Sequence, residues 1–547
     1  MPNIITRRSF LSNSGRAAVG LGLASLMNIP PFLKRALAEG SIGINNKKLI
    51  FIFLRGGNDG VNNVIPVLDP SYRGTADANR KFLAMPMDPV VDYSAASGQA
   101  DTVPINYPYA VRLGNGFATL NPALRDMSPI FNAGDLAVIH RAGYRSLSRS
   151  HFDSEQYWEK GADGTSTGQK VSNGIWYRTI VESGWNTSHA LAGVSLQSNM
   201  PASLRGEQPM TNLSSISRYN TLGVYSSMNS TNLDRVKILN ALDAANLQPY
   251  PSKDNRPMVH NLGVQFRDTL DTLQDPSFQS NAFFDEGGAY PDGTYLFPNS
   301  AAQDQIITGT TPAQYRVGSG GYGFLSNIRN CAQLLNSTDA IITGTELGGW
   351  DTHTAQVAFN SGTMTSSPHL GGHASLLRRV GAAYYALWRY FSLYGKGGAH
   401  EVPGAKVGWN DVVVVTMSEF GRTSLENDSQ GTDHAESSVM YVAGGSVQAG
   451  VHGCDLNPNP KLGGALNWAM GTGAKNGALY SADTNVGYLR RTIDYRSVLG
   501  EIIREHLGAT QNQLNRIIPA YANEGAEHLL NGGMVQTTPI IGELGII

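Results

Sequence analysis

Side chains able to bind a metal ion or to react follow four apolar runs of the chain. They are Asn58, Asp59, Ser150, His151, Asp351, His353, Glu419 and Arg422, with Asp433 and His434 in the next loop. In an open α/β sheet, ligands bind beyond the carboxyl ends of the strands, so residues that follow the strands gather at one edge. Carboxylates and imidazoles are donors that a divalent cation accepts in proteins. The spacing therefore predicts one charged, metal-binding rim.

Several of these positions also have a purely structural interpretation. Asp59 lies in an Asn-Asp-Gly sequence that favours a turn. Ser150 precedes Asp153 at the spacing of a helix-capping pair. A helix N-terminus also stabilises anions, so the same hydroxyl could attack a phosphorus or sulfur centre. Glu419 could support a metal ligand or form an ion pair with Arg422.

The other histidines are weaker candidates. His369 and His373 lie four residues apart before a long apolar-faced segment, but without the intervening glutamate of a zincin motif, so we expect surface or capping histidines. His452 is a candidate for one further ligand. No Gly-x-Ser-x-Gly sequence marks a strand-to-helix turn, which argues against an ordinary serine esterase.

Strand and helix patterns alternate along most of the chain. Continuous apolar runs predict buried strands at 47–54, 135–140, 339–345 and 411–417. Apolar residues at three- and four-residue spacing predict helices at 373–394 and 494–507, and another helix begins near His151. This alternation is typical of an α/β domain with a mostly parallel central sheet flanked by helices.

Residues 198–326 differ from the rest of the chain. They are rich in Ser, Asn and Thr, contain no strong strand run, and predict two modest helices at 233–245 and 259–273. We interpret this segment as a loop-rich insertion or cap on a single α/β domain that spans residues 39–547.

The first 38 residues resemble a twin-arginine export signal. Arg7 and Arg8 precede a weakly apolar stretch, and 36–38 is a small-x-small cleavage pattern. We therefore expect a periplasmic or extracellular protein. No other stretch of 18 apolar residues occurs, so we expect no membrane span after removal of the signal.

The composition excludes two classes of protein. Lys and Arg total 41 against 43 for Asp and Glu, which argues against a nucleic-acid-binding surface. Charged residues make up only 15% of the chain, where about 25% is usual, so neutral polar groups solvate much of the surface. Two cysteines, Cys331 and Cys454, are too few for a disulfide scaffold, although their pairing stays open.

Five short motifs, taken together, resemble the exported bacterial family catalogued as domain of unknown function 1501. They occur in family order between about residues 47 and 510. They are Leu-Arg-Gly-Gly-Asn-Asp-Gly at 54–60, Ser-Arg-Ser-His-Phe-Asp at 148–153, Gly-Trp-Asp-Thr-His at 349–353, Ser-Glu-Phe-Gly-Arg-Thr at 418–423 and Gly-Thr-Asp-His at 431–434.

This family is in turn similar to the alkaline phosphatase and sulfatase superfamily, whose parallel sheet carries two metal ions and a nucleophile. The resemblance implies that Asp59, Asp433 and His434 bind one metal ion, that Asp351 and His353 bind another, and that Ser150 is the nucleophile. Arg422 would stabilise the transition state. His151 or His452 would supply a missing ligand of the second ion, and Asn58 and Glu419 would have supporting roles.

Two functions are compatible with these residues. The first is an exported hydrolase of phosphate or sulfate esters, acting on a small molecule or a glycan, with one or two divalent ions. Zinc suits the mixture of His and Asp best, while manganese, calcium or magnesium would suit a site dominated by carboxylates. The second is a non-catalytic exported binding or assembly protein that keeps the fold and has an exported protein partner.

Overall fold

The computed structural model describes residues 46–91, 103–216, 283–464 and 487–547, together with residues 273 and 468. Within these ranges, residues 70–71, 73–79, 209, 215, 287–292, 307–308, 463, 520, 523–528 and 536–537 are not described. The predicted export signal and the predicted helix at 233–245 therefore lie outside the described residues, as does the helix at 259–273 apart from Leu273.

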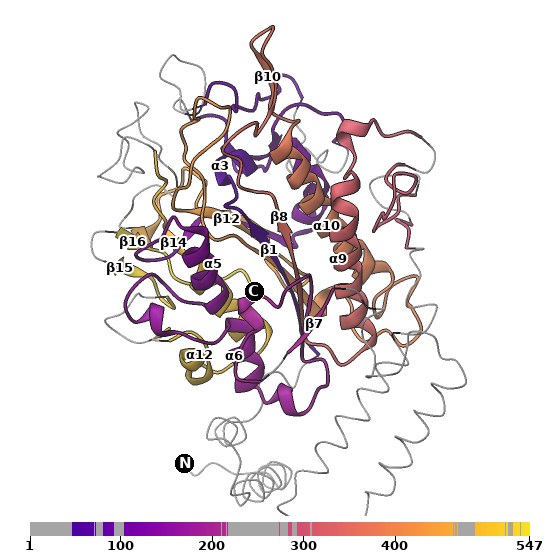
Figure 1. Ribbon diagram of the computed structural model, residues 1–547, viewed down its shortest axis with the longest axis vertical. Helices are drawn as coiled ribbons and strands as arrows, with labels where there is room; N and C mark the ends of the chain where they lie inside the picture. The colour runs from indigo at the N-terminus through magenta and orange to yellow at the C-terminus, as the bar shows by residue number, and fades with distance from the viewer. Residues whose placement is uncertain are drawn as a thin grey trace, which may run out of the picture.

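A mixed, mostly parallel sheet forms the centre of the molecule (Figure 1). Among the described residues it has nine strands, in the order β13-β5-β12-β11-β1-β8-β6-β7, with β14 beside β5. The strands are β1 (Lys48–Arg55), β5 (Leu136–Gly143), β6 (Gly193–Leu196), β7 (Thr211–Leu213), β8 (Ile342–Gly348), β11 (Val412–Met417), β12 (Ser438–Ala443), β13 (Gly450–His452) and β14 (Ile493–Asp494). This confirms the predicted α/β class.

One strand runs against the others. β12 pairs antiparallel with both β11 and β5, whereas the other strand pairs of this sheet are parallel. The apolar run of β12 was not among the predicted strands. Because β12 is antiparallel, its first residue lies at the same edge as the last residue of β11, which keeps the intervening loop at that edge.

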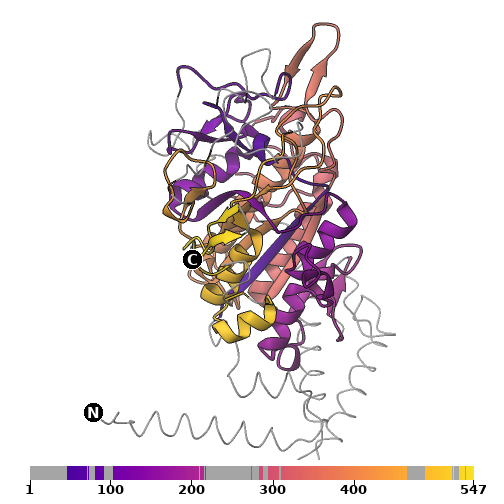
Figure 2. The same cartoon turned by 90° about the vertical axis from the view of Figure 1, so that its left-hand side faces the viewer.

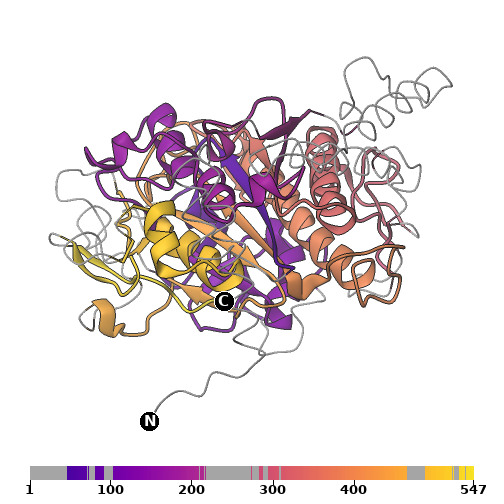
Figure 3. The same cartoon turned by 90° about the horizontal axis from the view of Figure 1, so that it is seen from below.

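Helices cover both faces of the sheet (Figures 1 and 3). One face, with Ile50 and Ile52 of β1, packs against α9 (Ser319–Ser337) and α10 (Gly372–Leu393). The other face, with Leu49 and Phe51, packs against α6 (Ile175–Glu182), α11 (Tyr495–Glu501) and α12 (Gln511–Ile517). Alternate residues of β1 thus enter different cores, because side chains of a strand alternate between its faces.

The two helices predicted at 373–394 and 494–507 are confirmed. α10 spans 372–393, and its predicted stripe, including Leu377, Val380 and Tyr384, is fully buried. Asp494 caps α11 by accepting a hydrogen bond from the Arg496 N–H, and a π-helical turn, η11 (Ile502–His506), continues it.

The smaller elements lie outside the central sheet. They are α3 (Gly60–Asn63), α4 (Ser128–Ala133), α5 (His151–Lys160), the 3₁₀ turn η3 (Pro122–Met127), the sheet β2 (Val64–Pro66), β4 (Ala118–Leu120) and β3 (Val111–Arg112), and the hairpins β9 (Ala358–Asn360) with β10 (Thr365–Ser367) and β15 (Gly533–Val535) with β16 (Thr538–Ile540). The hairpin of β9 and β10 projects from the body of the molecule (Figure 2).

Both ends of the predicted insertion contribute to the core. β7 extends the central sheet beside β6, and α9 begins at Ser319, inside the range 198–326. In the part of the chain that the structure describes, no helix has the length and apolar composition needed to span a membrane. Cys331 and Cys454 are both buried and do not form a disulfide with each other.

Candidate metal centre

Three segments that follow β5, β8 and β11 meet at one edge of the sheet. The first carries His151 at the start of α5, the second Asp351 and His353, and the third Asp433 and His434. An isolated bridge pairs Arg422 with His434 and so holds the two ends of the third segment together. The predicted convergence of strand-end residues is thus present for these five side chains.

Four of these side chains form what we call the histidine cluster: His151, Asp351, His353 and His434. One Asp351 oxygen lies 3.1 Å from His353 Nε2 and 3.2 Å from His434 Nε2, and the other lies 3.6 Å from His151 Nε2. The Nε2 atoms of His353 and His434 are 2.9 Å apart. Ligand atoms of His151, Asp351 and His434 all lie within 4.8 Å of one another.

The opposite ring nitrogen of each histidine faces a hydrogen-bond acceptor. His151 Nδ1 lies 2.9 Å from Glu419, His353 Nδ1 2.9 Å from Asp433, and His434 Nδ1 2.9 Å from the Arg149 carbonyl. A carbonyl or an ionised carboxylate can only accept, so each Nδ1 carries the proton. In the neutral rings, all three Nε2 lone pairs then point into the cluster.

Converging lone pairs require a positive charge between them. Without one, the Nε2 atoms and the Asp351 carboxylate would repel each other at these distances. His151 Nε2 is buried and has no hydrogen-bond partner among the described residues. Either a shared proton or a metal ion supplies this positive charge. A metal-bound histidine usually donates its other ring N–H to an acceptor, and each of these histidines faces one.

The cluster is open to solvent on one side. The Asp351 side chain is 48% exposed and the His353 side chain 40% exposed, so a ligand can reach both. The hydrogen bond to Glu419 raises the pKa of His151, whereas burial lowers the pKa of His434. Although burial alone would raise it, the bond from Arg422 brings the pKa of Asp351 to about 2.

Arg422 lies beneath the cluster rather than on the open rim. It is 1% exposed, and its guanidinium donates to Asp351, to the carbonyls of Gly56 and Gly57, and to the carbonyl of Thr432. Its contacts are therefore those of a positioning residue that orients Asp351. The sequence-based role, direct contact with a transition state, has no support in this geometry.

Two glycines allow this close packing. Gly56 and Gly57 have φ angles of 121° and 75°, which disfavour other residues. A Cβ atom on Gly56 would lie 2.4 Å from the Asp351 nitrogen, and one on Gly57 2.4 Å from the Phe420 ring. The two glycines after β1 therefore allow this backbone to lie close to the segments that carry Asp351 and Phe420.

Asp59 lies behind the cluster and is not one of its converging groups. Its carboxylate is fully buried and accepts from Arg80 at 2.5 and 2.9 Å and from Gln356 at 2.5 Å. Gln356 in turn accepts from Thr352 and Thr432, which neighbour the cluster residues. The expected grouping of Asp59 with Asp433 and His434 around one ion is not what the structure brings together, because Arg80 occupies both oxygens.

Ser150 is the exposed N-cap residue of α5, next to His151. Its side chain makes no capping hydrogen bond, and the expected pairing with Asp153 is made by Ser148 instead, at 3.3 Å. Arg149, one residue earlier, binds His434 through its carbonyl. The Ser150 hydroxyl is therefore not used by the helix cap.

Three other expectations can be compared with the structure. Glu419 is fully buried and bonds His151, whereas Arg422 pairs with Asp351, so among the described residues the alternative ion pair between Glu419 and Arg422 is not the one formed. Asn58 is also buried, and its side-chain amide has no hydrogen-bond partner among the described residues, while its backbone N–H donates to the Ser418 hydroxyl. His452 is the last residue of β13, which pairs with β5, and it is not one of the described residues whose ligand atoms converge.

His373 differs from its expected surface or capping position. It is 2% exposed, bonds Asn63, and has a pKa lowered by burial to about 4. Sequence reasoning also missed Arg80 and Gln356, which hold Asp59. No motif marks Arg80, because its partner lies 21 residues away in sequence and the pairing is tertiary.

These observations define an α/β protein with a histidine and aspartate cluster at the carboxyl edge of its sheet. A scan of protein families matches residues 404–455 to the family described as "Protein of unknown function (DUF1501)". The match includes Glu419, Arg422, Asp433 and His434, and supports the resemblance to that family over these residues. Comparisons with curated proteins and with solved structures found no match.

Proposed function

We propose that this chain is a metal-dependent hydrolase with one divalent ion held by the histidine cluster. The observation that carries the proposal is the convergence of three Nε2 lone pairs on the Asp351 carboxylate, each fixed by an outer acceptor. Three imidazoles and one carboxylate are a donor set that suits zinc best, with manganese as a second choice. Calcium and magnesium prefer oxygen ligands and fit less well.

The donor set supports one ion better than two. Asp59, which the superfamily resemblance assigns to a metal ion, is neutralised by Arg80 inside the protein. Asp433 is the only carboxylate of the predicted pair that reaches the cluster, and it does so through His353. We therefore infer that Asp59 and Asp433, the carboxylates that a second ion would need, bind other side chains of the protein instead.

The substrate class follows from the resemblance and from Ser150. We propose that the substrate is a phosphate or sulfate ester, of a small molecule or a glycan. A divalent ion supplies charge stabilisation for ester oxygens and lowers the pKa of a nearby hydroxyl. Ser150, at the N-terminus of α5, would be the nucleophile, and the exposed N–H groups of that helix turn favour an anionic ester beside it.

The remaining residues have positioning tasks in this proposal. Glu419 and Asp433 keep a proton on Nδ1 of His151 and His353, and the Arg149 carbonyl does the same for His434. Arg422 holds Asp351 in its ionised form at neutral pH. None of these groups needs to move for an ester to approach from the solvent side.

Metal analysis and turnover test the proposal together. We expect protein purified through its native export route to contain about one equivalent of zinc or manganese by mass spectrometry, and to hydrolyse members of a phosphate and sulfate ester panel. His434→Ala should lose both metal and turnover. His189→Ala, a change at a histidine outside the cluster, should lose neither. Metal-replete protein without turnover on the panel would leave a binding role only.

A non-catalytic role is the second candidate. It is favoured by the position of Asp59 outside the cluster. A protein of this fold that lacks one of the two sets of metal ligands can still serve in assembly. In that case the metal would be structural, and an exported protein would be the partner. Capture from periplasmic extract, with Ser150→Ala as bait beside the wild type, would recover the same partner with both proteins.

A further inference from the structure

Two arginines beside the histidine cluster carry charges that the surrounding protein does not pair. Arg149 is exposed and Arg490 is partly exposed, and neither guanidinium forms an ion pair or a hydrogen bond with the residues that the structure describes. Arg149 directly precedes Ser150, and its carbonyl lies 2.9 Å from His434 Nδ1. The planar guanidinium is the side chain best suited to bind phosphate and carboxylate groups. These two arginines are therefore candidates for contact with an anionic ligand.

The Arg149 guanidinium is held in place by an aromatic ring. Its Cζ atom lies 4.4 Å from the centroid of the Tyr488 ring, a cation–π distance. This contact restricts the side chain without supplying a carboxylate or carbonyl acceptor. The Asp153 carboxylate, which follows in α5, accepts a hydrogen bond from Ser148 instead. The N–H donors of Arg149 are thus both ordered and available to a ligand.

The segment that carries Arg490 is anchored on both sides of that residue. Leu489 is buried, and the Arg490 carbonyl accepts from Arg141 Nε at 3.0 Å. The next residue, Arg491, pairs with Asp494 at 3.0 Å. The backbone at Arg490 therefore has a defined position, and the charge of its side chain is the one that these contacts leave unpaired.

Positive charge exceeds negative charge at this place. Arg149, Arg490 and Arg491 all interact electrostatically with one carboxylate, that of Glu436, which lies two residues after His434. Burial raises the pKa of Glu436, and the three arginines only partly offset that effect. Since Arg491 is already paired, Arg149 and Arg490 share a single carboxylate whose ionised form is disfavoured. The surface beside the cluster thus has a positive potential, which concentrates anions.

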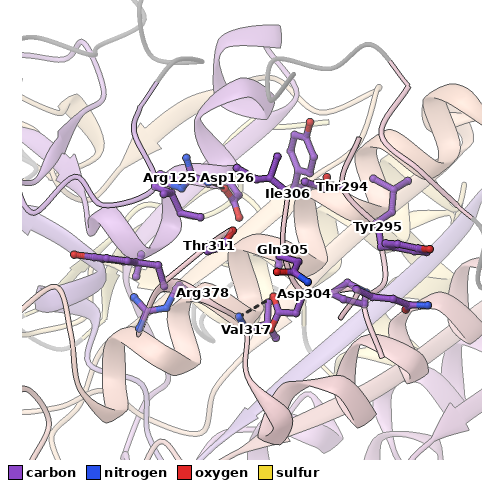
Figure 4. A pocket seen from close by; sticks show the side chains of 18 of the residues that line it. Arg125, Asp126, Thr294, Tyr295, Asp304, Gln305, Ile306, Thr311, Val317 and Arg378 are labelled. Carbon is purple, nitrogen blue, oxygen red and sulfur yellow. Dashed lines mark hydrogen bonds and ion pairs between the residues drawn. The ribbon is translucent and has the colours of Figure 1, made fainter. Parts of the chain in front are cut away.

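A cavity elsewhere in the molecule has no such excess of charge. It has a volume of about 130 Å³, lies between η3, α10 and the segment around 294–317, and is lined by no residue of the histidine cluster (Figure 4). Two arginines, Arg125 and Arg378, line it together with the two carboxylates of Asp126 and Asp304. Because these charges balance within the protein, the unbalanced arginines beside the cluster are the better place for an anion.

We propose that Arg149 and Arg490 form an anion-binding subsite beside the histidine cluster, and that the preferred substrate is an ester with a second anionic group. This inference rests on the proposed hydrolase function, because the ester itself would be held at the cluster and Ser150. The second group, a phosphate, sulfate or carboxylate, would accept charge-assisted hydrogen bonds from the two guanidinium groups. Since Arg149 adjoins Ser150, the two anionic groups would lie about one arginine side chain apart, a separation that a sugar ring can bridge.

Calorimetric titration of the full, zinc-loaded chain tests the subsite, with glucose 1,6-bisphosphate and glucose 1-phosphate as probes. Every titration uses the Ser150→Ala background, so that neither probe is consumed. We expect the bisphosphate to bind at least fivefold more tightly than the monophosphate. Arg149→Gln and Arg490→Gln should each reduce this ratio at least twofold and leave the affinity for the monophosphate within twofold. Arg205→Gln, a change at an exposed arginine that donates to the Met200 carbonyl, should leave the ratio unchanged.

Two results would overturn the proposal: a ratio below fivefold in the background protein, or an unchanged ratio in the folded Arg149→Gln and Arg490→Gln variants. Thermal melting checks that each variant is folded, and if one does not fold, the other decides. Phosphate release by the wild type, measured in parallel, separates the subsite from the hydrolase function. A ratio that falls in the variants supports the subsite even when the wild type releases no phosphate, whereas turnover with equal binding of the two probes refutes the subsite alone.

Discussion

Glu419 gives the sharpest test of the histidine cluster, because it touches His151 and no other cluster residue. Its Oε1 accepts from His151 Nδ1 at 2.9 Å and from the Gly56 N–H at 2.6 Å, and the side chain is fully buried. Glu419→Gln keeps the shape and can keep both bonds, but it removes the charge. The variant therefore isolates the electrostatic support that the carboxylate gives to one imidazole.

The expected loss follows from the strength of that one bond. A hydrogen bond to a charged group contributes about 1.5–3 kcal/mol, and a neutral one about 0.5–1.5 kcal/mol. Removing the charge should thus cost about 1.4 kcal/mol, which is about a tenfold weaker affinity for zinc. Glu419→Ala removes the bond as well, and should weaken binding about 100-fold, the upper end for outer-shell changes at metal sites.

Zinc competition titration against a chromophoric chelator measures both losses. Glu159→Gln is the matched control, since Glu159 is a buried carboxylate that pairs with Arg55 and accepts from the Ser203 N–H. It should leave zinc affinity within twofold of the wild type. If both Glu419 variants are folded and bind zinc as tightly as the wild type, His151 does not bind the ion and the proposed donor set is incorrect.

Three further outcomes are expected. Arg80→Met leaves the Asp59 carboxylate buried and unpaired, so urea unfolding should show a loss of about 3–5 kcal/mol, while zinc content of the folded protein stays unchanged. An unchanged stability would contradict the structural role of Asp59. Stability should also fall in acid, because burial lowers the pKa of three histidines below the ordinary 6.5, to about 3 for His140 and about 4 for His373 and His506. The unfolded chain takes up these protons below pH 6.5 and the folded chain does not, so full stability is present above pH 6.5 and is lost towards pH 4, at up to about 4 kcal/mol per pH unit; a flat urea midpoint from pH 7 to 5 would contradict this. Ser150→Ala should abolish ester hydrolysis and retain zinc, whereas Ser148→Ala should retain both; hydrolysis by Ser150→Ala at the wild-type rate would exclude Ser150 as nucleophile.

The sequence predicted the strand-end residues well because that prediction depends on local pattern. Apolar runs define β1, β5, β8 and β11, and the residues after them must emerge at the same edge of a parallel sheet. His151, Asp351, His353, Asp433 and His434 were found in this way. The antiparallel strand β12 was missed, since a short apolar run shows neither its direction nor its neighbour.

The partners of those residues could not be predicted in the same way. Asp59 follows the end of β1 and Asp351 the end of β8, yet Arg80 neutralises the first and Arg422 orients the second. Nothing in the two short motifs distinguishes them. The difference depends on where a distant arginine lies after folding, and a carboxylate becomes a structural group or a candidate ligand accordingly.

The amino-acid sequence by itself determined the α/β class, the edge at which polar groups gather and the donor types available there, because periodicity and residue chemistry are local properties. Only the tertiary structure decided which donors converge and which nitrogen of each histidine faces the cluster. Those outcomes depend on distances between segments hundreds of residues apart, such as His151 and Glu419, which are separated by 268 positions.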